Sequence, residues 1–185
     1  MSFLTSIHRL QTKASLRVLY HVSINRRRYE LVMEDAIHQF RQQISMCWDD
    51  ATISPKFLPR KPDQPIAAGQ CTATSYVLSR HLQSLYKKQS FVILVGEVWH
   101  KGHKVIPYHV WVVSQDLHNP SDSRIIDITA DQSRVLPKVI ISSARTLARD
   151  GTAYIAYTPI EDLRLLGGAA QKRAELLEQK YRRVT

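Results

Sequence analysis

The amino-acid sequence predicts an α+β fold in which one helix packs on a small antiparallel sheet. The helix is indicated by residues 70–88, where apolar side chains recur at helical spacing. The strands are indicated by runs rich in β-branched and aromatic residues, at positions 91–99, 105–113 and 124–128. Gly102 and the sequence Asn119-Pro120-Ser121-Asp122 supply turns between these runs, so we expect neighbouring strands to pair as antiparallel partners.

Additional helices are predicted at both ends of this core. Residues 29–48 have the spacing of an amphipathic helix, in which we place Arg41 on the polar face. The pattern is weaker towards the C-terminus. It predicts a strand over residues 153–157 and a charged surface helix over residues 160–181, interrupted by Gly167-Gly168.

Residues 49–68 form the connector between the first two predicted helices. Its prolines exclude a regular helix, and they are Pro55, Pro59, Pro62 and Pro65. We interpret the segment as an extended strap that leads into the turn before residue 71, because it is too short and too apolar at its ends for a free linker.

The chain divides into a basic extension at residues 1–32, a central domain at residues 33–160 and a charged C-terminal helix at residues 161–185. Residues 1–29 contain Arg and Lys but no Asp or Glu. This composition also occurs in transit peptides. We favour two simpler interpretations, which are an extension that docks on the domain as a helix and a translation start at Met33.

The net charge of +10 permits an acidic partner such as nucleic acid or an anionic membrane surface. The basic residues gather at the two ends around a nearly balanced middle, which is more typical of solvated flanks than of a binding groove. No zinc finger, aromatic RNA-binding motif or Gly-rich phosphate loop accompanies the charge. Nucleic-acid binding is therefore the secondary hypothesis.

No stretch reaches the roughly 20 apolar residues that a membrane-spanning helix needs. The chain has only 2 cysteines, which do not make a disulfide framework. Both observations favour a soluble, cytoplasmic protein in a reducing compartment, although whether the two cysteines pair stays open. The sequence does not indicate an oligomeric state.

Three residues from separate elements have the chemistry of a thiol-nucleophile triad. Cys71 follows the turn Gly69-Gln70 at the start of a predicted helix, where unpaired N–H groups lower a thiol pKa. His109 lies on the second predicted strand and Asp127 on the third. If these strands are neighbours, the carboxylate of Asp127 orients the His109 ring, and His109 takes the proton of Cys71.

Stabilising a developing oxyanion requires hydrogen-bond donors. The backbone N–H of Cys71 is one, and the side-chain amide of either Gln70 or Gln64 is the second, with the choice between them open. Trp111 shares a strand face with His109 and is a candidate for lining the cleft, although packing is the simpler role. The pair His100 and His103 flanks a turn without nearby Cys or carboxylate ligands, so we predict no metal and no cofactor.

Together, the ordered motifs resemble the YunG-like family of largely uncharacterised bacterial proteins. The resemblance covers residues 35–132, and it is carried by Gly69-Gln70-Cys71, by His109-x-Trp111 and by the string Asp127-Ile128-Thr129-Ala130-Asp131-Gln132. It implies that residues 33–160 form a papain-like or transglutaminase-like catalytic domain. Asp131 and Gln132 belong to the family-like string, and we expect them to support the triad. Transglutaminases have Trp after the nucleophile, whereas this chain has Thr72.

The leading functional hypothesis is a cysteine-dependent hydrolase or acyl-transferase. It acts on an amide bond of a peptide, an isopeptide or a glutamine side chain through a thioester intermediate, so we expect a peptide or protein substrate. The alternatives are a non-catalytic binding module on the same fold and a basic nucleic-acid-binding protein.

Overall fold

The structure, a computed structural model, describes residues 30–116, 123–162 and 167–185. The chain divides into two compact units, Met1–His38 and Gln39–Thr185. The described part of the first unit is helical, and helical residues continue to position 45 in the second. Almost all of the predicted basic extension, and the turn predicted at Asn119-Pro120-Ser121-Asp122, lie outside the described residues.

A five-stranded antiparallel sheet forms the centre of the second unit, with strand order β4-β3-β2-β1-β5. Its strands are β1 (Gln89–His100), β2 (His103–Asp116), β3 (Arg124–Asp127), β4 (Ile140–Ser142) and β5 (Thr152–Ile160). The α+β class and the small antiparallel sheet are therefore confirmed. The three strands predicted first are β1, β2 and β3, which lie side by side as expected.

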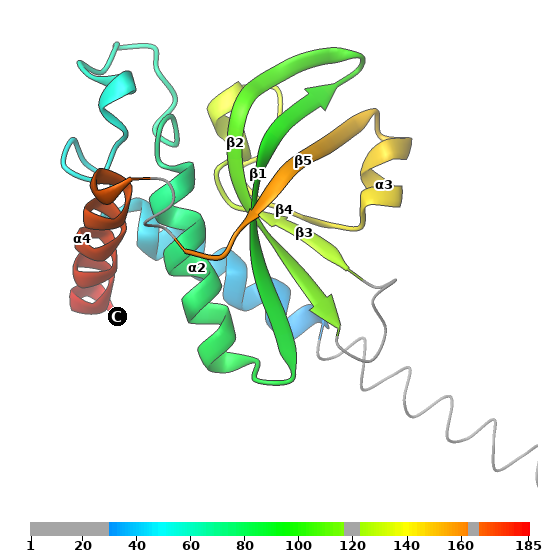
Figure 1. Ribbon diagram of the computed structural model, residues 1–185, viewed down its shortest axis with the longest axis horizontal. Helices are drawn as coiled ribbons and strands as arrows, with labels where there is room; N and C mark the ends of the chain where they lie inside the picture. The colour runs from blue at the N-terminus through cyan, green and yellow to red at the C-terminus, as the bar shows by residue number, and fades with distance from the viewer. Residues whose placement is uncertain (1–29, 117–122, 163–166) are drawn as a thin grey trace, which may run out of the picture. The chain divides into compact units, whose positions relative to one another are not determined.

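Beyond the helical residues 39–45, this unit contains the helices α2 (Cys71–Leu85), α3 (Ala144–Arg149) and α4 (Gly168–Val184), with 3-10 turns η1 (Pro55–Phe57) and η3 (Ala130–Ser133). Helix α2 packs on β1 and β2 and also on α4, whereas α3 packs on β5. Figure 1 shows α2 and α4 side by side next to the sheet, with α3 beyond β5.

The central part of strand β2 is deeply buried. Residues 109–114 are buried without a break, which requires cover on both faces of the sheet because successive side chains point to opposite faces. Helix α2 contacts β2, and Val98, Trp111 and Leu147 belong to a separate apolar cluster that includes a residue of α3. His109 therefore begins the buried stretch of β2, next to the exposed residue Tyr108.

Gly167 is the N-cap residue of α4 and Gly168 is its first residue, so the glycine pair starts the helix and does not interrupt it. Gly167 adopts a φ of 93°, a conformation that favours glycine. The buried positions of α4 follow the i, i+4, i+7 spacing and are Ala170, Ala174, Leu177 and Tyr181. The predicted surface helix thus has one fully packed side, and its first turn reaches the site described below.

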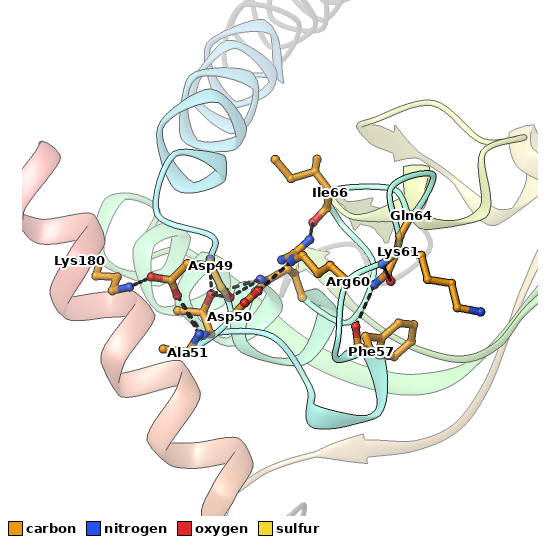
Figure 2. A network of polar contacts seen from close by, with 11 residues as sticks. Asp49, Asp50, Ala51, Phe57, Arg60, Lys61, Gln64, Ile66 and Lys180 are labelled. Atoms are coloured by element: carbon orange, nitrogen blue, oxygen red, sulfur yellow. Dashed lines mark hydrogen bonds and ion pairs between the residues drawn. The ribbon is translucent and has the colours of Figure 1, made fainter.

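A hydrogen bond joins the strap over residues 49–68 to the residue that follows it: the N–H of Ser54 donates to the carbonyl of Gly69 at 3.0 Å. Figure 2 shows its polar contacts: Arg60 binds Asp50 at 3.3 Å and donates to the carbonyl of Ile66, also at 3.3 Å. Asp49 forms an ion pair with Lys180 of α4. These contacts fix the approach to Cys71.

Gly69 is required where the strap enters α2. Its φ is 75°, and a Cβ at this position would lie 2.7 Å from the ring of Phe57. A side chain here would therefore be strained by the backbone and would also displace Phe57.

Strand β4 and helix α3 are not predicted by the sequence. They have 3 and 6 residues, too few for hydrophobic periodicity to reveal them. Among the residues that the structure describes, no helix has the length and apolar content needed to cross a lipid bilayer.

Candidate functional site

Cys71 is the first residue of α2 and leaves only 6% of its surface exposed. Gln70 is the N-cap residue, but its side chain does not bond to the N–H groups of the first turn. The first turn contains no acidic residue. Within the described residues, no carbonyl accepts a hydrogen bond from the N–H of Cys71. The sulfur therefore lies at the positive end of a helix, with an unused donor beside it.

The start of α2 is tied to β2 at Val110. Pairing between β2 and β3 ends at Val112 and Ile126. Further along β2, the carbonyl of Val110 accepts from the hydroxyl of Ser75 at 2.9 Å, and the N–H of Val110 donates to the sulfur of Cys71. One residue of the strand thus fixes the nucleophile in front of its neighbour His109.

His109 is fully buried and contacts both other members of the predicted triad. Its Nε2 lies 2.6 Å from Oδ2 of Asp127, and its ring is close enough to Cys71 to lower the pKa of that thiol. The ring stacks at 6.0 Å from Trp111 and lies 6.3 Å from Tyr154. The structure therefore brings together Cys71, His109 and Asp127, which are distant in sequence.

Asp127 ends β3 and accepts hydrogen bonds at both carboxylate oxygens. Oδ2 accepts from the hydroxyl of Tyr154 at 2.7 Å in addition to bonding His109. Oδ1 accepts from the N–H and the hydroxyl of Thr129, at 2.8 and 3.1 Å. A buried carboxylate with these donors is held in one orientation and favours its charged form.

The pKa values of the three groups are coupled. Burial raises the pKa of the Cys71 thiol, but the hydrogen bond and charge of His109 outweigh burial, so that pKa lies below its ordinary value. Burial lowers the pKa of His109, and the charge of Asp127 overcomes this and raises it. Burial also opposes ionisation of Asp127, yet His109 and the other donors hold its pKa below the usual range. All three directions favour a thiolate beside an imidazolium.

The three glutamines named from the sequence occupy different environments. Gln70 is fully buried, and its amide bonds to the hydroxyl of Thr52 at 3.1 Å. The amide of Gln64 bonds within the strap, to the carbonyl of Phe57 at 3.3 Å (Figure 2). Neither side chain lines the cavity at Cys71, whereas Gln132 lines it and places Nε2 within hydrogen-bond distance of Nδ1 of His109.

Asp131 forms a buried ion pair with Arg41 at 2.8 Å. Arg41 is only 6% exposed and its guanidinium lies 4.2 Å from the ring centre of Trp48, so its expected place on the polar face is wrong. Arg41 follows Phe40 and precedes Ile44 by three residues, a spacing that places it on the apolar side of the helix. The ion pair anchors η3, the turn that carries Gln132.

Trp111 packs in the core and is 1% exposed. It belongs to the cluster that contains Val98 and Leu147, and it does not line the cavity. Gly96 makes room for it, because a Cβ on Gly96 would lie 2.8 Å from the indole and 2.0 Å from the carbonyl of Ile155. Trp111 therefore supports the ring of His109 from the side away from solvent.

Tyr154 and Thr129 complete the site and were not identified from the sequence. Tyr154 lies on β5, whose existence was predicted, but nothing in its spacing relates it to Asp127. Thr129 follows Asp127 by two residues, a separation typical of a local side-chain to backbone bond. This two-residue separation is the sequence signal that could have identified Thr129 as a partner of Asp127.

A cavity of about 520 Å³ opens beside the sulfur of Cys71. The residues that line it are Ser54, Lys56, Phe57, Gly69, Cys71, Thr72, Val105, Ile106, Pro107, Tyr108, Gln132, Ala170 and Arg173. The strap, α2, β2, η3 and α4 each contribute to this wall. The volume lies in the range of small-ligand sites.

Among the described residues, no group of three or more His, Cys, Asp and Glu side chains is arranged to hold a metal ion. Cys47 and Cys71 are both free thiols. The arrangement therefore presents a thiol at the wall of a cavity, with an imidazole beside it that is paired with a carboxylate.

No protein-family model, no curated protein and no solved structure matches this chain. The chemistry of the site therefore has to be inferred from its own side chains.

Proposed function

We propose that this chain is a cysteine-dependent hydrolase or acyl-transferase with a papain-like or transglutaminase-like core, acting on an amide bond. The observation that carries the proposal is the placement of His109 beside both Cys71 and Asp127, with Cys71 at the wall of the cavity. Burial without these partners would raise the pKa of a thiol. A lowered pKa in this setting is typical of a nucleophile.

In the first step, the thiolate of Cys71 attacks the carbonyl carbon of the amide, and a C–S bond forms. The C–N bond then breaks, and the amine leaves with the proton that His109 carries. Nε2 of His109 is bonded to Asp127, so Nδ1 is the nitrogen left to exchange this proton. The product of the step is a thioester on Cys71 and a neutral imidazole.

In the second step, water or an amine attacks the thioester, and His109 accepts the proton of the incoming nucleophile. The C–S bond breaks and restores the thiolate beside the imidazolium. Water gives hydrolysis or deamidation, and an amine gives acyl transfer. Asp127 keeps its charge in both steps and stabilises the imidazolium.

We further propose that the oxyanion is bound by the N–H of Cys71 and the amide of Gln132. Gln132 lines the cavity, whereas Gln64 and Gln70 are bonded elsewhere. A neutral His109 accepts from Gln132 at Nδ1, but a protonated His109 does not. The amide is thus released to donate to the oxyanion when the ring is charged.

A burst experiment with p-nitrophenyl acetate tests the proposal. We expect release of p-nitrophenol in proportion to the enzyme, together with an acetyl group on Cys71 detected by peptide mass spectrometry. The burst should disappear in Cys71→Ala and remain in Cys47→Ala, which removes the other buried thiol. Acetylation of both cysteines at equal rates, or a burst that survives in Cys71→Ala, would refute the proposed nucleophile.

A further inference from the structure

We propose that the cavity beside Cys71 selects amide substrates that carry a carboxylate together with an apolar group. This inference rests on the proposed acyl-transfer function and adds a substrate class to it. Lys56 and Arg173 line the cavity, and none of its lining residues is Asp or Glu. The formal charge of the wall is therefore positive, apart from the charge on Cys71 itself.

Within the part of the chain that the structure describes, both cations lack an ion-pair partner, unlike several other basic residues. Arg60, Arg134 and Lys180 each bind a nearby carboxylate, on Asp50, Asp63 and Asp49. Within residues 30–116, 123–162 and 167–185, no ion pair is formed by Lys56 or Arg173. Their charge is thus available to a ligand.

The starts of two helices add to the same positive field. Helix α2 begins at Cys71, and α4 presents Ala170 of its first turn to the cavity. Neither first turn contains an acidic residue. Because the N-terminus of a helix carries partial positive charge, two helix dipoles and two side chains all favour an anion near the nucleophile.

The rest of the wall is apolar or aromatic. Phe57 and Tyr108 are 39% and 53% exposed, and both line the cavity. Val105 and Pro107 of β2 extend this surface. Such a wall favours an apolar side chain next to the carboxylate, a combination found in acidic peptides and at the free carboxyl ends of apolar peptides.

Two alkylating agents of nearly equal size measure the charge preference directly. Iodoacetate carries a carboxylate and iodoacetamide a neutral amide, and each transfers its carbon to the thiolate with loss of iodide. The quantity of interest is the ratio of the two rates at Cys71. We expect Lys56→Gln and Arg173→Gln each to lower this ratio by about threefold and the double variant by about tenfold, with a smaller effect at high salt.

Lys138→Gln and Arg149→Gln are matched controls, because they remove the same charges from exposed positions that do not line the cavity. A ratio that is unchanged in the double variant, or that falls equally in the controls, would overturn the charge preference. The iodoacetamide rate alone reports the nucleophile. A slow iodoacetamide rate would thus count against the proposed function and a constant ratio against the substrate class.

Protection experiments distinguish the two sources of the carboxylate. Acetyl-phenylalanyl-alanine has a free chain end, acetyl-phenylalanyl-glutamate amide has only a side-chain carboxylate, and acetyl-phenylalanyl-alanine amide has neither. We expect at least one acidic peptide to slow the alkylation of Cys71 by iodoacetamide more than the neutral peptide does, and the double variant to lose this difference. The more protective acid identifies the source. Equal protection by all three would contradict the inference.

Discussion

Two carboxylates of the sheet, Asp127 and Glu97, have similar hydrogen-bond environments but different charge partners. The Asp127 network consists of Asp127, His109, Tyr154 and Thr129, and the Glu97 network consists of Glu97, Lys104, Trp99 and Tyr157. Each carboxylate accepts from a tyrosine hydroxyl and an aromatic N–H, and the pKa of each lies below its usual range.

The difference lies in the cation. Glu97 pairs with Lys104, whose side chain is 42% exposed. Asp127 pairs with His109, and both side chains are fully buried. A buried anion without a cation is costly, so Asp127 favours a proton on His109, and Cys71 is the neighbouring group that supplies one. The same carboxylate arrangement is structural at Glu97 and, in our proposal, activates a thiol at Asp127.

The largest expected effect comes from neutralising the two carboxylates separately. Asp127→Asn removes the charge that raises the pKa of His109, so the proton returns to Cys71. Alkylation of Cys71 by iodoacetamide near pH 6 should fall by about ten- to thousandfold, because a close opposite charge shifts a pKa by about one to three units. Glu97→Gln is the control and should leave this rate unchanged. Equal alkylation rates of Cys71 in Asp127→Asn and Glu97→Gln would show that Asp127 does not activate the thiol any more than Glu97 does.

The tyrosines offer a smaller, matched comparison. Tyr154→Phe deletes a donor to a buried carboxylate and should lower the free energy of unfolding by about 1.5 kcal/mol. Tyr157→Phe deletes the corresponding donor to Glu97, but Tyr157 is 58% exposed, so water replaces the hydroxyl and the loss should be much smaller. Denaturant unfolding of the two variants measures both values. A larger loss in Tyr157→Phe would contradict the assigned difference in burial.

The smallest expected effect is a pH dependence at Glu97. The hydrogen bonds from Lys104, Tyr157 and Trp99 lower the pKa of Glu97 from 4.5 to about 2. A lowered carboxyl pKa stabilises the folded state above the unfolded pKa, and this stabilisation is lost as the pH falls towards the folded value. The difference in free energy of unfolding between wild type and Glu97→Gln should therefore shrink as the pH falls from 4.5 to about 2. A constant difference across this window would show that ionised Glu97 does not contribute.

The sequence predicts those parts of the fold that repeat a pattern over several residues. Helix α2 and strands β1, β2 and β3 follow from periodicity, and the order of Cys71, His109 and Asp127 indicated a triad before its geometry was known. The structure places His109 beside both Cys71 and Asp127, and the triad itself stays a prediction.

Contacts between distant segments could not be predicted from the sequence. Which amide reaches the cavity depends on the path of the strap and of η3, so the sequence indicated Gln64 and Gln70 as amide donors and Gln132 only as a support of the triad. The pairing of Arg41 with Asp131 joins residues 90 positions apart. Local propensity contains no information about such pairs.

The pH dependence of iodoacetamide alkylation, resolved by peptide mass spectrometry, tests the proposed nucleophile most directly. Cys47 is the internal reference, since burial raises the pKa of its thiol. We predict that Cys71 reacts well below the free-thiol pKa of about 8.5, that Cys47 does not, and that His109→Ala abolishes the difference. If Cys71 follows the same profile as Cys47 in the wild type, or keeps its reactivity without His109, the thiolate–imidazolium pair is absent and the proposed function fails.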